Sequence, residues 1–352
     1  MLERVRIGMV GAGAVAARHV RTLLAMEGVE VAAVADPALD RARELADEAG
    51  AAAYPNHMEL LAAERLDAVY ICVPPFAHGP PELAVIDAGL PMFVEKPVAI
   101  DQETATAIAT RLAGRPLVTC TGYHWRWLDI FDRAADLLGD RPARLVQCSW
   151  LDKVPPPPWW RRRDRSGGQT IEQTTHVLDT ARGLAGDVVE VHAFAARAVS
   201  TPTPSGSVGE AAPPAADVHD VSVASLRFAS GAVGTVASTC LLPRLQLAGV
   251  QVIADGLSLE LSETELLVEV DGRRDAWTAE GNARPRPDRD FVAAVRGGEN
   301  RIRVPWPEAY RTHLLACAIT RSADEGRPLP VTREGSGEPR RGAPVGRGGE
   351  GG

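Results

Sequence analysis

The first third of the chain alternates short apolar runs with segments of helical periodicity. Runs such as VRIGMV (residues 5–10) and DAVYICV (67–73) contain few or no polar residues, which is typical of parallel strands buried on both faces. The regular alternation predicts a doubly wound α/β domain with a parallel sheet. The predicted strands are 5–10, 29–36, 67–73, 91–95 and 116–120, and the predicted helices are 14–26, 38–49, 80–88 and 101–113.

The pattern changes after about residue 121, where strands come as hairpins. Alternating apolar and polar residues flank the turns Ser230-Gly231, Asp255-Gly256 and Asp271-Gly272. This arrangement predicts an α+β domain with an open, mainly antiparallel sheet and with helices at 170–184 and 308–322 on one face. We therefore expect domains at 1–120 and 121–331. A polar loop is expected at 200–217, and a disordered, Gly/Arg/Pro-rich tail at 332–352.

Composition narrows the class of protein. The chain has 352 residues and a net charge of −8, which argues against a nucleic-acid partner. No apolar stretch approaches the roughly 20 residues that span a bilayer, and the N-terminus does not resemble a signal peptide. The five cysteines are scattered without a CxxC pair, which favours reduced thiols over disulfides or a zinc site. We expect a cytoplasmic protein with no membrane partner and no metal.

A glycine-rich turn follows the first predicted strand. The segment Gly11-Ala12-Gly13-Ala14-Val15-Ala16 reads GxGxxA and opens a helix. Gly11 allows the tight turn, Gly13 lets a pyrophosphate approach the backbone, and Ala16 allows close packing of helix and sheet. A helix cap without a ligand is the alternative, but strand, turn and helix occur in the order that dinucleotide binding requires.

The second predicted strand ends at Asp36, whose carboxylate is placed to accept hydrogen bonds from the adenosine ribose and to repel a 2′-phosphate. NAD is therefore expected in preference to NADP, although Arg41 could reach a 2′-phosphate. Pro74 and His78 follow a later strand at the same carboxyl edge, and Glu95 ends another, so these residues are further candidates for cofactor contact.

Two segments carry candidate chemistry. Lys96, after Glu95 at a strand end, could stabilise an alkoxide as hydride leaves carbon. A helix over 170–184 would place Glu172, His176 and Asp179 on one face, with His176 as a general base. Taken singly, a surface lysine and a half-buried structural histidine are the simpler interpretations, and such a face could also bind zinc.

The opening GAGAVAARH, the EKP triplet and the pattern GGxxxExxxHxxD together resemble the Gfo/Idh/MocA family of oxidoreductases, across nearly the whole chain to about residue 331. The resemblance implies a Rossmann domain followed by an open-faced α/β domain. It also implies action on sugars or polyols with NAD(P), Lys96 polarising the substrate oxygen and His176 moving the proton. The position of Glu172 is commonly Asp in that family, and the Lys-Pro bond is often cis.

Further residues are candidates for substrate contact. His124, Trp125 and Arg126 follow the first domain, where the chain crosses the cleft, and Trp125 could stack on a sugar face. Trp160 lies in the Pro/Trp/Arg-rich stretch 155–165, which could form a wall of the site. Hinge packing and a solvated loop are the alternatives for these two segments.

Three functions remain open at this point. The first is a sugar or polyol dehydrogenase, the second an NAD-retaining glycoside hydrolase, and the third a non-catalytic NAD-binding regulator. Lys96 and His176 together favour an enzyme, because a regulator needs neither. The apolar residues that alternate along 221–238 and 250–270 predict a homodimer or homotetramer formed through the second sheet.

Overall fold

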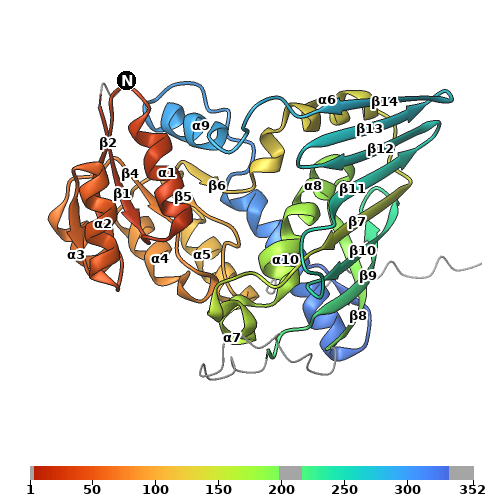
Figure 1. The fold of residues 1–352 in the computed structure, drawn as a ribbon, viewed down its shortest axis with the longest axis horizontal. Coiled ribbons are helices and arrows are strands. Elements are labelled where there is room, and N and C mark those ends of the chain that lie inside the picture. Colours follow the sequence, from red (N-terminus) through yellow and green to blue (C-terminus); the bar gives the residue numbers. More distant parts are fainter. Residues whose placement is uncertain (1–3, 198–215, 333–352) are drawn as a thin grey trace, which may run out of the picture.

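The computed structural model describes residues 4–197 and 216–332, which form two sheets with helices between and around them (Figure 1). Residues 200–215 of the loop expected at 200–217, and residues 333–352 of the tail expected at 332–352, lie outside the described residues. The predicted fold class is confirmed: a parallel sheet is followed by a mainly antiparallel one. Within the described ranges, no helix combines the length and apolar character of a membrane span.

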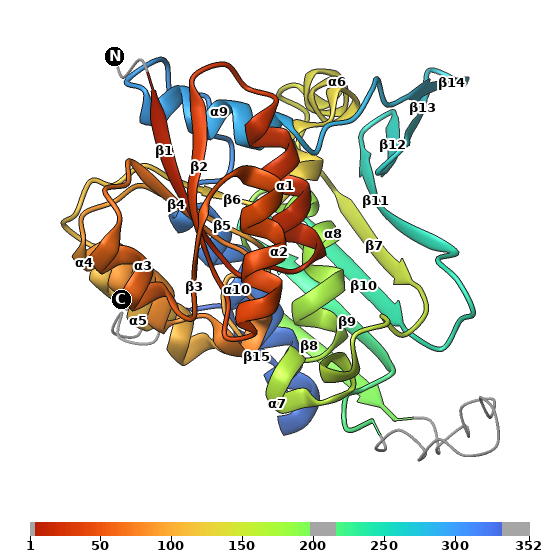
Figure 2. The same cartoon turned by 60° about the vertical axis from the view of Figure 1, so that its left-hand side comes forward.

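The first sheet has the strand order β3-β2-β1-β4-β5-β6, and all its strands are parallel. Its strands are almost entirely apolar because helices cover both faces, with α1 and α2 on one face and α3, α4 and α5 on the other (Figure 2). The strands are β1 (Val5–Val10), β2 (Val29–Ala35), β3 (Ala52–Tyr54), β4 (Ala68–Ile71), β5 (Met92–Val94) and β6 (Thr119–Thr121). The helices are α1 (Ala14–Leu24), α2 (Leu39–Ala49), α3 (His57–Ala63), α4 (Pro80–Asp87) and α5 (Gln102–Leu112).

Two of these elements, β3 and α3, are absent from the sequence prediction. β3 is a three-residue edge strand whose residues are only half-buried, so it shows no apolar run. α3 begins after Asn56, whose side chain accepts a hydrogen bond from the amide of Glu59 and so caps the helix. That cap is visible in the sequence, but the helix after it is too short to show a clear period.

The second sheet has nine strands in the order β14-β13-β12-β11-β7-β10-β9-β8-β15. All three predicted hairpin turns are present, and Gly231, Gly256 and Gly272 each adopt positive φ there. Among the strands in the described ranges of this sheet, β10 and β7 are the one pair that runs parallel. The strands are β7 (Leu145–Leu151), β8 (Val188–Ala196), β9 (Val221–Phe228), β10 (Val233–Thr239), β11 (Leu247–Ala254), β12 (Leu257–Ser262), β13 (Glu265–Val270), β14 (Arg273–Thr278) and β15 (Leu329–Pro330).

Helices cover one face of this sheet, on the side toward the first sheet (Figure 1). The main two are α8 (Thr175–Ala185) and α10 (Trp306–Glu325), with the short α6 (Asp129–Leu138) near β12 and β13. The opposite face carries exposed apolar side chains, including Phe194, Val223 and Val233. This open face leaves apolar surface in contact with solvent in a single chain.

The last part of the chain returns to the first sheet. Phe291, on α9 (Arg286–Val295), and Trp306, at the start of α10, are buried in the core that surrounds β1, β4 and β5. The amide of Thr121 also donates to the carbonyl of Val304. The division of the chain at residue 120 stays a prediction, and this return shows that the two sheets share part of their packing.

Candidate active site

The glycine-rich turn after β1 has the shape that a dinucleotide requires. Gly11 adopts φ of +98°, and a Cβ there would lie 2.4 Å from the carbonyl oxygen of Cys72, so no other residue fits. A Cβ at Gly13 would meet nothing within 4 Å, which leaves open space at the N-terminus of α1. The first-turn amides of Ala14, Val15 and Ala16 have no acceptor within an α-helix and suit a pyrophosphate.

Asp36 follows β2 and organises this turn. Its carboxylate accepts hydrogen bonds from the amide of Ala12 at 2.9 Å and from the amide of Ala38 at 2.8 Å. An ionised carboxylate has about four acceptor positions, so two remain for other donors. Its predicted contact with the ribose stays a prediction.

Pro74 and His78 flank the short turn Pro75–Ala77 after β4. His78 is buried, and its Nδ1 lies 2.5 Å from Oε1 of Glu82, whose other oxygen accepts from the amide of Gly79. The structure therefore gives His78 a partner on α4, and its predicted contact with the cofactor stays a prediction.

The end of β5 connects the two sheets through Lys96. Its Nζ donates to the carbonyl oxygen of Glu172 at 2.7 Å and to Oε1 of the same residue at 2.8 Å. The second carboxylate oxygen of Glu172 accepts from Nε1 of Trp160 at 2.9 Å. The peptide bond between Lys96 and Pro97 is cis.

The segment that carries Glu172 differs from the predicted helix. Residues Thr170–Thr174 form a π-helical turn, and the α-helix α8 begins only at Thr175. The wider turn changes the phase of Glu172 relative to the rest of the helix, and π-turns are frequent at functional sites. The carboxylates of Glu172 and Asp179 have different hydrogen-bond partners. Asp179 accepts from Thr312 at 2.9 Å, whereas Glu172 accepts from Lys96 and Trp160.

His176 lies one turn after Glu172 and is 8% exposed. Aromatic rings surround it, and its Nδ1 has no partner among the described residues. Burial, followed by the nearby charge of Lys96, holds the pKa of His176 well below its ordinary value of 6.5. The imidazole is therefore neutral at neutral pH and free to take a proton. The surrounding rings, with centroids 5.4 to 6.1 Å away, belong to Tyr123, His124, Trp125 and Trp150.

A charged group next to His124, whose ring lies against that of His176, is missing from the sequence prediction. Nε2 of His124 lies 2.9 Å from Oε1 of Glu263, which also pairs with Arg284 at 2.6 Å. The hydrogen bond from His124 is the main cause that holds the pKa of Glu263 at about 2. Glu263 lies between β12 and β13, more than a hundred residues after His124, so no local pattern connects them.

The other predicted substrate residues lie in different surroundings. Trp125 is buried, and its ring lies roughly parallel to the ring of His176. Arg126 donates to the carbonyl oxygen of Asp179 at 3.0 Å, and its guanidinium lies over the ring of Phe131. Trp160 is fully buried, so its rings contact protein in this structure. These roles in substrate binding stay predictions.

Glu95 is held by a buried charged cluster. Its Oε1 lies 2.9 Å from Nε2 of His19 and accepts from Arg18, while Nδ1 of His19 lies 2.6 Å from Asp288 on α9. Burial alone would lower the pKa of His19, but Asp288 and Glu95 outweigh burial and raise it to about 9. Burial would raise the pKa of Glu95, but His19, Arg18 and Lys96 hold it at about 2. A protonated His19 thus joins α1, the end of β5 and α9.

Stability should depend on this imidazolium. A pKa raised from 6.5 to about 9 means that the contribution of His19 is fully present below pH 6.5 and is lost as pH rises through about 9. The difference in unfolding free energy between the native chain and His19→Gln should shrink by on the order of 3 kcal/mol over that interval. Urea denaturation at several pH values measures it. A constant difference would contradict the prediction, and His192→Gln on β8 is the control.

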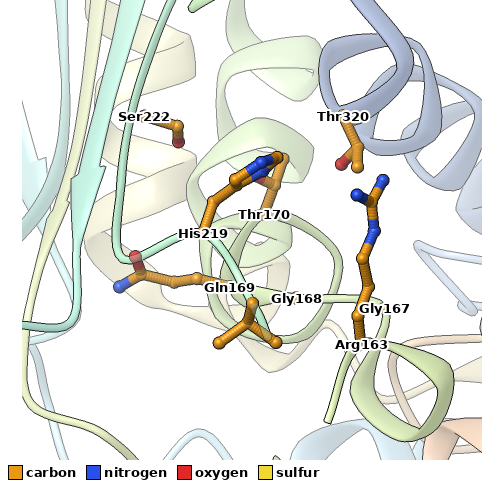
Figure 3. Close-up of a pocket in the computed structure, with 9 residues that line it drawn as sticks. Arg163, Gly167, Gly168, Gln169, Thr170, His219, Ser222 and Thr320 are labelled. Carbon is orange, nitrogen blue, oxygen red and sulfur yellow. The ribbon is translucent and has the colours of Figure 1, made fainter. Parts of the chain in front are cut away.

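A separate pocket lies at the start of the π-turn (Figure 3). Gln169, Arg163, His219 and Thr320 are among the residues that line it, and Lys96, Glu172 and His176 are not. Arg163 is already paired with Asp324. The pocket is therefore distinct from the candidate active site.

Two models of one protein family match this chain. Residues 5–123 match the NAD-binding Rossmann-fold model of the Gfo/Idh/MocA oxidoreductase family, and residues 142–259 match its C-terminal domain. The chain is 27% identical to the myo-inositol 2-dehydrogenase of Thermotoga maritima over 66% of this chain and 67% of that protein. It is 32% identical to the rhizopine catabolism protein MocA of Rhizobium meliloti over 53% of this chain and 58% of that protein.

Solved structures show the same fold at low identity. A levoglucosan dehydrogenase in complex with NADH and L-sorbose superposes with a TM-score of 0.81 at 20% identity, over 94% of this chain and all of that one. The WlbA dehydrogenase of Bordetella pertussis, in complex with NADH and UDP-GlcNAcA, gives 0.77 at 19% identity, over 93% and 98%. The two family models span more than half of the 352 residues. The chain therefore belongs to the Gfo/Idh/MocA family of NAD-binding oxidoreductases.

Proposed function

We propose that the protein is an NAD-dependent dehydrogenase that acts on a secondary alcohol of a sugar, polyol or sugar derivative. One observation carries the proposal. Lys96, at the carboxyl edge of the cofactor-binding sheet, reaches the carbonyl oxygen of Glu172, one turn before the neutral, buried His176. Lys96 and His176 would therefore supply a positive charge and a base beside the edge where a dinucleotide would bind.

The turn residues Gly11 and Gly13, with the amides that open α1, would hold the pyrophosphate of NAD, and Asp36 would face the ribose. When bound, NAD supplies the hydride acceptor. Lys96 stabilises negative charge on the substrate oxygen, and His176 takes the hydroxyl proton. The family membership and the name of the Thermotoga maritima relative, a myo-inositol 2-dehydrogenase, support this class of substrate.

The functional test is release of NADH from NAD across a panel of inositols, aldoses and sugar derivatives, followed by absorbance. Net release supports a dehydrogenase. Cleavage of a glycoside without net NADH would instead indicate an NAD-retaining hydrolase. Cofactor binding with no turnover of either kind would indicate a regulator.

Asp36 provides a test of cofactor preference. Replacement with serine removes the negative charge that repels a 2′-phosphate, so Asp36→Ser should narrow the gap between NADH and NADPH affinity by about tenfold, the size of one lost charge contact. Fluorescence titration with both cofactors measures this. Equal or tighter NADPH binding by the native chain would contradict the assignment, and Asp40→Ser, on α2 and more exposed, is the matched control.

The exposed face of the second sheet leads us to propose a dimer or tetramer. Phe194 on β8 pairs in register with Val223 on β9, and these side chains are 62% and 48% exposed. A second copy that covered this face would remove the apolar patch from water. Sedimentation should show an oligomer at micromolar concentration, and Val223→Asp should weaken it at least tenfold. A monomeric native chain would contradict this.

A further inference from the structure

The carboxylate of Glu172 is held between two donors from distant parts of the chain. Lys96 donates to Oε1 and Trp160 donates to Oε2, at 2.8 and 2.9 Å. The side chains of Glu172 and Lys96 are 16% and 17% exposed and Trp160 is fully buried, so both donors act where water screens weakly. Nothing in the function proposed above uses Trp160.

The position of Trp160 is fixed independently of the site. It is fully buried against Val218 and Cys240, and the half-buried Val154 and Trp159 complete this cluster. It lies on the short turn Pro158–Arg161, and a run of four prolines (155–158) leads into that turn. Because proline fixes φ near −65°, the segment enters the turn with few alternative conformations. The indole N–H is thus a rigid donor on a preordered loop.

The hydrogen bonds of Lys96 show what the indole N–H of Trp160 does in the site. An ammonium group has three N–H bonds, and two of them are directed at the carbonyl and Oε1 of Glu172. A glutamate side chain has three rotatable bonds, and the Trp160 contact selects the rotamer that meets Lys96. With two N–H bonds anchored, the direction of the third is set.

We propose that Trp160 is a positioning residue, whose indole N–H holds Glu172 on Lys96 so that the remaining N–H of Lys96 points at the substrate oxygen. The loop 152–161, between β7 and the end of the turn that carries Trp160, thereby contributes to the site through the Glu172 carboxylate and not through a stacking surface. The direction of the third N–H toward a substrate oxygen rests on the function proposed above, whereas the anchoring of Lys96 by Glu172 does not.

The sequence offers a direct measurement of that anchoring, because Lys96 and Lys153 are the only lysines among the 352 residues. Lys153 is exposed and serves as an internal reference. Limited acetylation with acetic anhydride, read by peptide mass spectrometry, gives the reactivity of Lys96 relative to Lys153. No substrate or turnover is needed, so failure of the proposed function leaves the result interpretable.

Trp160→Phe removes the N–H and keeps most of the apolar volume. We expect it to raise the acetylation of Lys96 relative to Lys153 by about tenfold. This factor corresponds to the loss of one hydrogen bond to a charged group. Trp159→Phe removes a half-buried tryptophan from the same turn and the same cluster, but Glu172 accepts from Trp160 and not from Trp159, so the ratio should stay within about twofold. An unchanged ratio in a folded Trp160→Phe protein, or an equal rise in both variants, would overturn the proposal.

Glu172→Ala tests the same link if Trp160→Phe does not fold, because it removes the acceptor in place of the donor. It should release Lys96 to acetylation by a similar factor and should shift one of the seven tryptophan indole N–H resonances. No change in any indole resonance would overturn the proposal. Where a substrate has been found, Trp160→Phe should lower kcat while NADH affinity stays unchanged.

Discussion

Lys96→Ala is expected to lower kcat on the order of 10²-fold or more, the loss that follows removal of a group that stabilises a developing oxyanion. The ammonium lies at the carboxyl edge of the first sheet, held by the carbonyl and carboxylate of Glu172. Alanine removes the charge that lowers the cost of an alkoxide. Steady-state kinetics with NAD and a substrate identified from the sugar panel measure the effect.

The matched control is Lys153→Ala, which removes the other lysine of the chain from an exposed position and should leave kcat within about twofold. NADH affinity should survive in Lys96→Ala, because the pyrophosphate and adenosine contacts lie at the glycine-rich turn and Asp36. Equal losses in both lysine variants, or an undiminished kcat in Lys96→Ala, would contradict the assignment.

The fold could be predicted from the sequence because both sheets leave a strong local signal. Parallel strands that are covered on both faces appear in the sequence as apolar runs. In the strands of the second sheet, apolar and polar residues alternate on both sides of turns such as Asp271-Gly272, where both residues adopt positive φ. The elements β3 and α3 were missed, since a three-residue edge strand and a two-turn helix are too short for periodicity to show. The return of α9 to the first sheet is tertiary and has no local signature.

Residues of the candidate site could be predicted only where the sequence pattern around them identifies their structural position. Lys96 follows a strand and His176 lies in a helix, so both are recognisable in order along the chain. The π-turn at Thr170–Thr174 was not predicted, because a helical period does not distinguish a wider turn from an α-helix. Trp150 meets the ring of His176, and Glu263 pairs with His124 and Arg284, only after the sheet has formed. The hydrogen bond from Trp160 to Glu172 likewise requires the folded loop.

His176→Ala is also expected to cut kcat on the order of 10²-fold or more, as loss of a general base does. Oxidation of an alcohol needs a group that takes the hydroxyl proton, and His176 is neutral because burial and Lys96 lower its pKa. The other candidates beside it differ: His124 is bonded to Glu263, and burial raises the pKa of Tyr123, which makes a phenolate base unfavourable. His192→Ala, on β8 of the second sheet, is the control.

The pH dependence tests the same assignment more sharply than the rate. A base acts only above its pKa, and the pKa of His176 is lowered, so the acid limb of kcat/KM for alcohol oxidation should lie below pH 6.5. Because Lys96 is the largest of the charges that lower it, the residual activity of Lys96→Ala should show that limb displaced toward higher pH. An acid limb at the same pH in both proteins would mean that His176 is not the titrating base. Near-normal turnover by His176→Ala at neutral pH would mean the same, and His124 would then be the next residue to replace.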